Sequence, residues 1–275
     1  MSKLKFDSTS SIKGVLFQFL IALERCFKMQ EGQSIYIETY GDVSVLGSLF
    51  DSKQIESKFY KKALTDSDKN VWKSIYNWMR EDFPLDMFSS LVLLTTQKVS
   101  IDSAWLNWNS KTTTERMDVL RNIKKNFDLQ KRKNKDLATC MNIIFDTKNA
   151  TRLSQIAKML YIDSISMDGN QYHKYLQEKY GKNIPDIQKG RFISHMFGYI
   201  LNPDIVSHNW RITYEDFTKE AEEVTKTLVE NTAVFPAKLK LADIQKNDYD
   251  GYAFVEKIKD IKYEDVIPDA IDDYV

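Results

Sequence analysis

The sequence predicts an α/β fold in which a mixed sheet is flanked by helices and followed by a mostly helical C-terminal region. In the first part of the chain, strand-like apolar runs stand on both sides of a segment with helical spacing. A helix that crosses between two strands in this way joins a parallel pair. Residues 90–96 (SLVLLTT) are almost continuously apolar, as expected of a strand buried on both faces. After Asn109, apolar residues recur at helical spacing in one segment after another.

Residues 1–110 are expected to form the core of the fold. The first helix should begin at Ser10 or Ser11, either of which can cap it, and should end before Gly32. Three strand-like segments come next, at residues 34–39, 42–46 and 53–60. A second helix, capped by residues 64–67, should end before Pro84, and the buried strand 90–96 follows it.

Residues 111–275 are expected to form a helical region that packs on this core and completes a cleft. The predicted helices are 113–127, 135–147, 150–160, 172–180, 187–201 and 213–229. Residues 210–213 can add one strand before the last of these helices. The final segment, 253–275, is helical in pattern and acidic at its end. Two interpretations stay open: the natural chain continues beyond Val275, or, more simply, Val275 is its natural C-terminus.

Composition indicates a globular protein with no overall charge preference for nucleic acid. The 275 residues include 39 basic and 39 acidic side chains, so any basic cleft must be local. Cys26 and Cys140 stand in apolar helical patterns, which favours reduced core cysteines over a disulfide or a zinc site. The longest apolar run is too short to cross a bilayer, and the N-terminus lacks the order of a secretory signal. We therefore expect a cytoplasmic protein with no membrane partner.

Asp42, Glu56 and Lys58 have the side chains that a metal-dependent phosphodiesterase needs. Because side chains alternate along a strand, Gln54, Glu56 and Lys58 project to one side of the segment 53–60. Two carboxylates are suitable ligands for Mg²⁺, for which Mn²⁺ can substitute. A lysine on the same face can steady the attacking water or the charged phosphate. We therefore expect Asp42 and Glu56 to bind the metal and Lys58 to act beside it.

Glu38 and Gln18 are candidate assisting catalytic residues. Glu38 shares strand parity with Asp42, unless Gly41 introduces a bulge, and it is a candidate further metal ligand. Gln18 lies in an otherwise apolar helix, where a buried amide needs a hydrogen-bond partner. That partner is either a neighbouring backbone group or the metal site, and both interpretations stay open.

Several side chains are candidates for contacts with DNA phosphates, which supply most of the non-specific affinity for DNA. Lys61 and Lys62 directly follow the proposed catalytic strand. Gln97 follows the buried strand, where it can orient water or phosphate, or can form an ordinary hydrogen-bonded strand end. The most basic run includes Lys131, Arg132 and Lys133, although such a run is also typical of a solvated face.

Motifs spread over the first half of the chain resemble one nuclease family. They are Gly14 with Gln18, Ile37-Glu38, Asp42-Val43, residues 56–60 (ESKFY), 64–66 (LTD), 71–78 (VWKSIYNW) and 94–97 (LTTQ). Together they are similar to the DNA endonuclease domain of CD-NTase-associated effectors, which occurs in the CBASS and Lamassu antiphage systems. The resemblance covers roughly residues 10–110 densely and becomes thinner in residues 191–198 and 210–217.

The resemblance implies a restriction-endonuclease-like fold and a Mg²⁺-dependent endonuclease that cuts double-stranded DNA with little sequence preference. The family's acid and acid-x-lysine motif, PD-(D/E)xK, falls here on Asp42, Glu56 and Lys58. Such an effector requires regulation, so the resemblance also implies a nucleotide-sensing domain or an SMC-like ATPase complex as partner. An oligomer is compatible with this kind of control.

Two alternatives to this assignment stay open. Some family members carry Gln-x-Lys at this strand, and aligning Gln54 with that motif would place Glu56 where the lysine belongs. The chain would then be a catalytically silent interaction subunit of a multi-component ATPase defence complex. A more distant alternative is a helical scaffold in which the Glu-x-Lys strand is an incidental edge strand facing water. A separation of Asp42 and Glu56 too large for one ion would favour that alternative.

Overall fold

The computed structural model describes residues 9–48, 50–130, 134–165, 167–230 and 253–260. The chain divides into two units, Met1–Leu228 and Val229–Val275, and each is described by itself. In the second unit, the described helix is α10 (Ala253–Asp260). It covers the beginning of the helix predicted for 253–275, and the remainder of that prediction lies outside the described residues.

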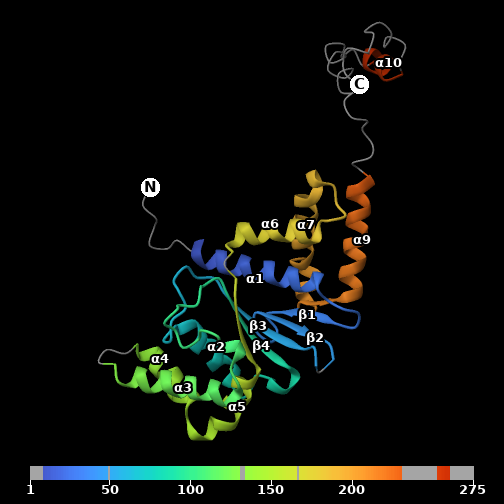
Figure 1. Cartoon of the computed structure of the whole chain (residues 1–275). Helices are drawn as coiled ribbons and strands as arrows, with labels where there is room; N and C mark the ends of the chain where they lie inside the picture. Colours follow the sequence, from blue (N-terminus) through green and yellow to red (C-terminus); the bar gives the residue numbers. More distant parts are fainter. Residues whose placement is uncertain (1–8, 49, 131–133, 166, 231–252, 261–275) are drawn as a thin grey trace. The chain divides into compact units, whose positions relative to one another are not determined.

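One mixed sheet forms the centre of the first unit (Figure 1). Its strands, among the described residues, are β1 (Ser34–Ile37), β2 (Val43–Leu46), β3 (Lys53–Lys58), β4 (Ser90–Thr95), β5 (Leu160–Ser164) and β6 (Arg211–Thr213). They lie in the order β5-β4-β3-β2-β1-β6. β1, β2 and β3 pair antiparallel, whereas β3, β4 and β5 pair parallel. α2 (Lys69–Met79) connects the parallel neighbours β3 and β4 along the chain, as the crossover pattern predicted.

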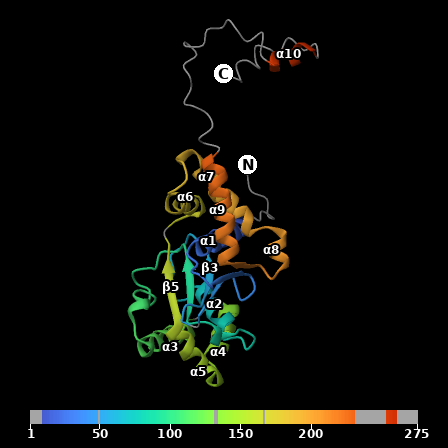
Figure 2. The ribbon, with the colours of Figure 1, turned by 90° about the vertical axis from the view of Figure 1, so that its right-hand side faces the viewer.

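Helices cover both faces of this sheet (Figures 1 and 2). α1 (Thr9–Phe27), α6 (Gly169–Tyr180), α7 (Lys189–Ile200) and α9 (Tyr214–Glu230) lie on one face, with the short helix α8 (Pro203–Ser207) nearby. α2, α3 (Thr113–Asp128), α4 (Lys135–Ile144) and α5 (Ala150–Met159) lie on the other. Each face has its own apolar core, and side chains such as Ile55 and Leu94 belong to the α1 side while Leu91 and Leu93 belong to the α2 side. The predicted fold class, a mixed sheet flanked by helices with a mostly helical C-terminal region, is confirmed.

The second half of the chain contributes more to the sheet than its helical pattern predicted. β5 begins at the residue after α5 ends and occupies one edge of the sheet, next to β4 (Figure 2). This strand was not predicted. β6 occupies the other edge and confirms the strand expected within 210–213. The residues after 110 therefore complete the sheet as well as cover it.

Three smaller features bear on the sequence-based expectations. β1 ends at Ile37, two residues earlier than predicted, because Glu38 has a positive φ of 57°. Cys26 is a buried free cysteine, as expected, whereas the free cysteine Cys140 is only partly buried. Within the described ranges, none of the helices has both the length and the apolar character needed to cross a bilayer.

Candidate active site

The candidate site is built on the hairpin that connects β1 and β2. The strands close at the pair Ile37 and Val43, and the Glu38 amide donates to the Asp42 carbonyl at 3.2 Å. Gly41 has a φ of 107°, which an L side chain rarely adopts. A Cβ atom there would lie 2.3 Å from Gln54 Nε2 and 3.0 Å from Glu56 Oε1. Glycine is therefore favoured at this position both by its conformation and by the close approach of the Gln54 and Glu56 side chains.

Asp42, Glu56 and Lys58 converge at the end of this hairpin. β2 and β3 pair with Val43 opposite Ile55, which brings the preceding Asp42 beside Glu56. Lys58 Nζ donates to Glu56 Oε2 at 2.9 Å and to Asp42 Oδ2 at 3.5 Å. The Ser57 amide donates to the same Asp42 oxygen at 2.7 Å and so fixes that carboxylate. One ammonium group thus contacts both candidate metal ligands.

The electrostatics of this cluster are those of a site with excess negative charge. Glu56 is only 5% exposed. Burial and the neighbouring Asp42 carboxylate raise the pKa of Glu56, although Lys58 and Gln54 oppose this shift. Burial tends to lower the pKa of Lys58, but the carboxylates of Glu56 and Asp42 outweigh it and raise that pKa. Lys58 is therefore held as an ammonium between two carboxylates that repel each other.

The chemistry of these donors fits a divalent cation with hard oxygen ligands. Mg²⁺ is commonly bound by one or two carboxylates and completes its shell with water or substrate oxygens. Asp42 and Glu56 supply such a pair, and a cation would offset both the burial and the repulsion by Asp42 that raise the pKa of Glu56. Among the residues that the structure describes, no group of three or more His, Cys, Asp or Glu side chains is arranged to hold a metal. Any remaining ligands must come from backbone, water or substrate.

Gln18 reaches this site from α1. Its Nε2 atom donates to Glu38 Oε1 at 2.7 Å and to the Asp42 carbonyl at 3.0 Å. Gln18 is 6% exposed, so its amide group forms hydrogen bonds with the loop and not with solvent. The two bonds are of both kinds that the sequence allowed, one to a backbone carbonyl and one to a side chain of the candidate site. The expected strand parity between Glu38 and Asp42 is wrong, because Glu38 lies in the loop with a left-handed backbone.

Gln54 donates a hydrogen bond to the Glu56 carboxylate oxygen that Lys58 does not contact. It is fully buried, and its Oε1 atom accepts a hydrogen bond from Trp78 Nε1 at 2.5 Å. Its Nε2 atom donates to Glu56 Oε1 at 3.3 Å. The sequence placed Gln54 on the same strand face as Glu56 and gave it a role only in the alternative alignment with the Gln-x-Lys motif. The signal was available, since a buried amide on the same strand face as an acid needs a partner.

The candidate DNA-binding residues differ in their accessibility. Lys61 and Lys62 are exposed directly beyond β3. Gln97 is 2% exposed, and its amide donates to the Lys62 carbonyl at 3.0 Å and to Asp68 Oδ2 at 2.8 Å. Gln97 thus forms the hydrogen-bonded strand end that the sequence also allowed, and its amide is not exposed for a phosphate contact in this structure. Lys131, Arg132 and Lys133 lie outside the described residues.

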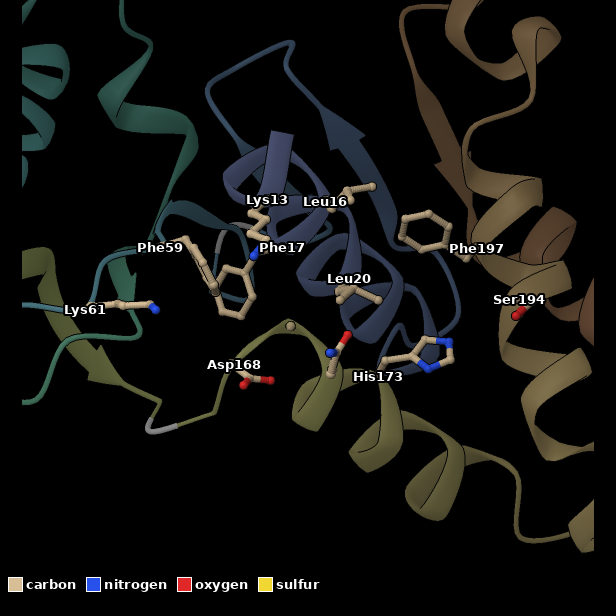
Figure 3. Close-up of a pocket in the computed structure, with 12 residues that line it drawn as sticks. Lys13, Leu16, Phe17, Leu20, Phe59, Lys61, Asp168, His173, Ser194 and Phe197 are labelled. Carbon is tan, nitrogen blue, oxygen red and sulfur yellow. The ribbon is translucent and has the colours of Figure 1, made fainter. Parts of the chain in front are cut away.

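Two cavities lie near the end of β3, one on each side of the sheet, and Glu56 lines one of them. A cavity of about 620 Å³ on the α2 side is lined by Gly41, Glu56 and Trp78 among others, so Glu56 faces it directly. The second, of about 510 Å³, lies on the α1 side and is lined in part by Phe59, the residue after Lys58 (Figure 3). Space for a ligand therefore exists on both sides of the strand that carries Glu56 and Lys58.

Comparison with known proteins gives distant structural likenesses. No family model and no curated protein matches the chain. The Moraxella osloensis Cap4 SAVED/CARF-domain containing receptor matches at 17% identity and a TM-score of 0.41, over 78% of this chain and 49% of that one. The Acinetobacter baumannii Cap4 receptor with the cyclic trinucleotide 3'3'3'-cAAA matches at 15% and 0.39, over 90% and 50%. A further structure of the Acinetobacter baumannii receptor matches at 15% and 0.38, over 83% and 49%. The chain spans about half the length of these structures, and identities and TM-scores this low carry no conclusion about activity or ligand.

Proposed function

We propose that this chain is a metal-dependent endonuclease that hydrolyses phosphodiester bonds in double-stranded DNA. The observation that carries the proposal is the convergence of two carboxylates on one lysine, with Lys58 Nζ at 2.9 Å from Glu56 and 3.5 Å from Asp42. A phosphodiesterase needs this set, because it must hold a cation, place a water molecule and stabilise negative charge in the transition state.

Each residue of the cluster has a distinct part in this chemistry. Asp42 and Glu56 would hold Mg²⁺, with Mn²⁺ as a substitute, and the bound cation supplies charge neutralisation and a water of lowered pKa. Lys58 positions the attacking water or stabilises the charged phosphate from the same strand face. The Ser57 amide orients the Asp42 carboxylate. Gln18 fixes the loop by holding Glu38 and the Asp42 carbonyl together.

DNA is the substrate that the surroundings of the cluster favour. Lys61 and Lys62 are exposed immediately beyond Lys58 and can neutralise backbone phosphates. Such contacts do not read base sequence, which agrees with cleavage of low sequence preference. The motifs around Asp42, Glu56 and Lys58 resemble those of antiphage effector nucleases. This resemblance supports a role in bacterial defence, under the control of a nucleotide-sensing domain or an SMC-like ATPase partner.

The second candidate function is a catalytically silent interaction subunit of a multi-component defence complex. One observation favours it: Lys58 bridges both carboxylates, so the cluster can be a closed ion network that needs no metal. A silent subunit should show no Mg²⁺- or Mn²⁺-dependent thermal stabilisation. A nuclease should show one, and Asp42→Ala should remove it.

The nuclease proposal is tested by plasmid degradation in Mg²⁺ with the parent protein and Lys58→Ala. We expect the variant to lose activity by a factor on the order of 10²–10⁴, because removing a positioned catalytic group has effects of this size. Lys53→Ala is the matched control, since Lys53 is an exposed lysine on the same strand and should keep full activity. Circular dichroism shows whether each variant is folded. Full activity in folded Lys58→Ala would refute the proposal.

A further inference from the structure

The cavity of about 510 Å³ on the α1 side has the composition of a nucleotide site (Figure 3). Its volume is that of pockets that hold small organic ligands. Aromatic and aliphatic side chains, including Phe17, Phe59 and Phe197, form much of its wall. Lys13 and Lys61 are both exposed at its rim. An apolar, aromatic interior with cations at the mouth suits a ligand that has a flat ring and a phosphate.

The two lysines and two of the aromatic rings gather at one end of this cavity. Figure 3 shows Lys13 and Lys61 beside Phe17 and Phe59. The centroids of the two rings lie 5.3 Å apart, and because Phe17 is only 1% exposed, Phe59 is the ring that a ligand can reach here. Within the described residues neither lysine forms an ion pair. Their charge is therefore available to an anion that occupies this end.

This end of the cavity adjoins the candidate active site along the chain. Phe59 directly follows Lys58, and Phe17 directly precedes Gln18. Phe17 and Phe59 belong to the apolar core on the α1 side of the sheet, whereas Leu93, the β4 neighbour of Glu56, belongs to the core on the α2 side. The carboxylates and the cavity thus lie on opposite faces of the sheet, and both are next to the end of β3, where Phe59 follows Lys58. A DNA strand that crosses this end of β3 could place its phosphate at the carboxylates and an adjacent nucleotide in this cavity.

We propose that this cavity binds one unpaired nucleotide of the DNA strand being cut, with the base against Phe59 and its phosphate at Lys13 and Lys61. This inference rests on the proposed nuclease function. A paired duplex is too wide to enter a cavity of about 510 Å³, so only a base that has left the helix can do so. Stacking on aromatic side chains is available to every base, so the site selects unpaired structure rather than sequence.

The test compares two fluorescent duplexes in equilibrium binding to the full chain, in EDTA so that no cleavage occurs. One duplex is fully paired and the other carries a single unpaired adenine. We expect the second to bind about tenfold more tightly, the effect of stacking one base. Free dAMP should compete with the bulged duplex and not with the paired one. Equal competition against both would place the nucleotide outside this cavity and overturn the proposal.

Two variants assign the preference to the cavity without removing any core side chain. Asn170→Trp fills the cavity from an exposed lining position, and Lys13→Glu reverses a rim charge. Both should reduce the affinity for the bulged duplex to near that for the paired one. Gln155→Trp and Lys73→Glu are the matched controls, because they make the same changes at exposed positions on α5 and α2. The controls should keep the tenfold preference.

The outcomes separate this inference from the nuclease proposal. No preference for the bulged duplex in the parent protein, or a preference that survives both Asn170→Trp and Lys13→Glu, overturns the nucleotide site. A preference that both variants remove supports it, whatever the plasmid assay shows. If plasmid degradation is absent while that preference is present, the nuclease proposal fails and the cavity remains a nucleotide-binding site.

Discussion

Two buried glutamates in this protein stand in opposite electrostatic situations. Glu24 on α1 is 3% exposed and accepts hydrogen bonds from the Tyr172 hydroxyl at 2.6 Å and the Tyr175 hydroxyl at 3.2 Å. Lys28 lies 2.6 Å from it. Burial tends to raise the pKa of Glu24, but the hydrogen bonds from Lys28 and Tyr172 outweigh burial and lower it. The charge of Glu24 is thus fully compensated within the fold.

Glu56 on β3 is similarly buried and also paired with a lysine, but its surroundings include a second acid. Lys58 and the Gln54 amide donate to it, while Asp42 lies opposite. Burial and Asp42 together raise its pKa. Burial and a lysine partner are thus common to both glutamates. What distinguishes Glu56 is a second carboxylate, which leaves a negative charge that a cation would neutralise.

The largest predicted difference between the two glutamates is in how much their replacement by glutamine lowers the free energy of unfolding. Glu24→Gln should destabilise the protein by about 3 kcal/mol, because it weakens charged hydrogen bonds to buried partners. Glu56→Gln should leave stability within about 1 kcal/mol of the parent, because it also removes the repulsion with Asp42. Urea unfolding in metal-free buffer measures both values. Equal losses would show that the two carboxylates are compensated alike and would break the comparison.

A smaller loss of stability is expected when a methyl group is added at Gly41, next to Gln54 and Glu56. Gly41→Ala should cost about 2 kcal/mol, because the new Cβ combines an unfavourable φ with contacts to Gln54 and Glu56. Gly32→Ala is the control, since Gly32 has a φ of 79° and open space around it. Only backbone strain applies there, and about 1 kcal/mol is expected. Thermal unfolding of both variants tests this; a loss at Gly41 no larger than at Gly32 would mean that the loop does not hold Glu56.

The smallest effect is in the pH dependence of stability without metal. The folded pKa of Glu24 lies below its ordinary value of 4.5, so its contribution is present above 4.5 and is lost as pH falls through the folded pKa. The folded pKa of Glu56 lies above 4.5, so the folded state binds the proton more tightly and stability declines as pH rises from 4.5 through that pKa. Glu24→Gln should flatten the acid side of the profile, and Glu56→Gln should flatten the decline above 4.5. Urea midpoints measured across this range decide it, and unchanged profiles in both variants would contradict both shifts.

Much of the architecture follows from apolar patterning, and what was missed has physical causes. The crossover from β3 through α2 to β4 is long and strongly patterned, so the parallel pair could be predicted. β5 could not, because it starts directly after α5 and buries only Leu160 and Ile162. The sequence pattern of a short edge strand with only two buried residues cannot be distinguished from that of the end of a helix.

The candidate site, like the fold, could be predicted from the sequence only in part. Alternation along the strand was sufficient to place Glu56 and Lys58 on one face, and the antiparallel hairpins bring Asp42 beside them. The position of Glu38 could not be obtained this way, because its φ of 57° takes it out of the strand. Gly41 was the local signal for that turn. The burial of Gln97 depends on the loop carrying Lys62 and Asp68, and this is a tertiary contact that no local pattern reports.

The central claim is that Asp42 and Glu56 form a cation site whereas Glu24 belongs to the structure alone. Calorimetric titration of Mn²⁺ into the parent protein, Asp42→Asn and Glu24→Gln tests it most directly. The account predicts saturable binding to the parent, retention of that binding in folded Glu24→Gln, and its loss in Asp42→Asn. No binding to the parent, or equal binding to Asp42→Asn, would contradict the account.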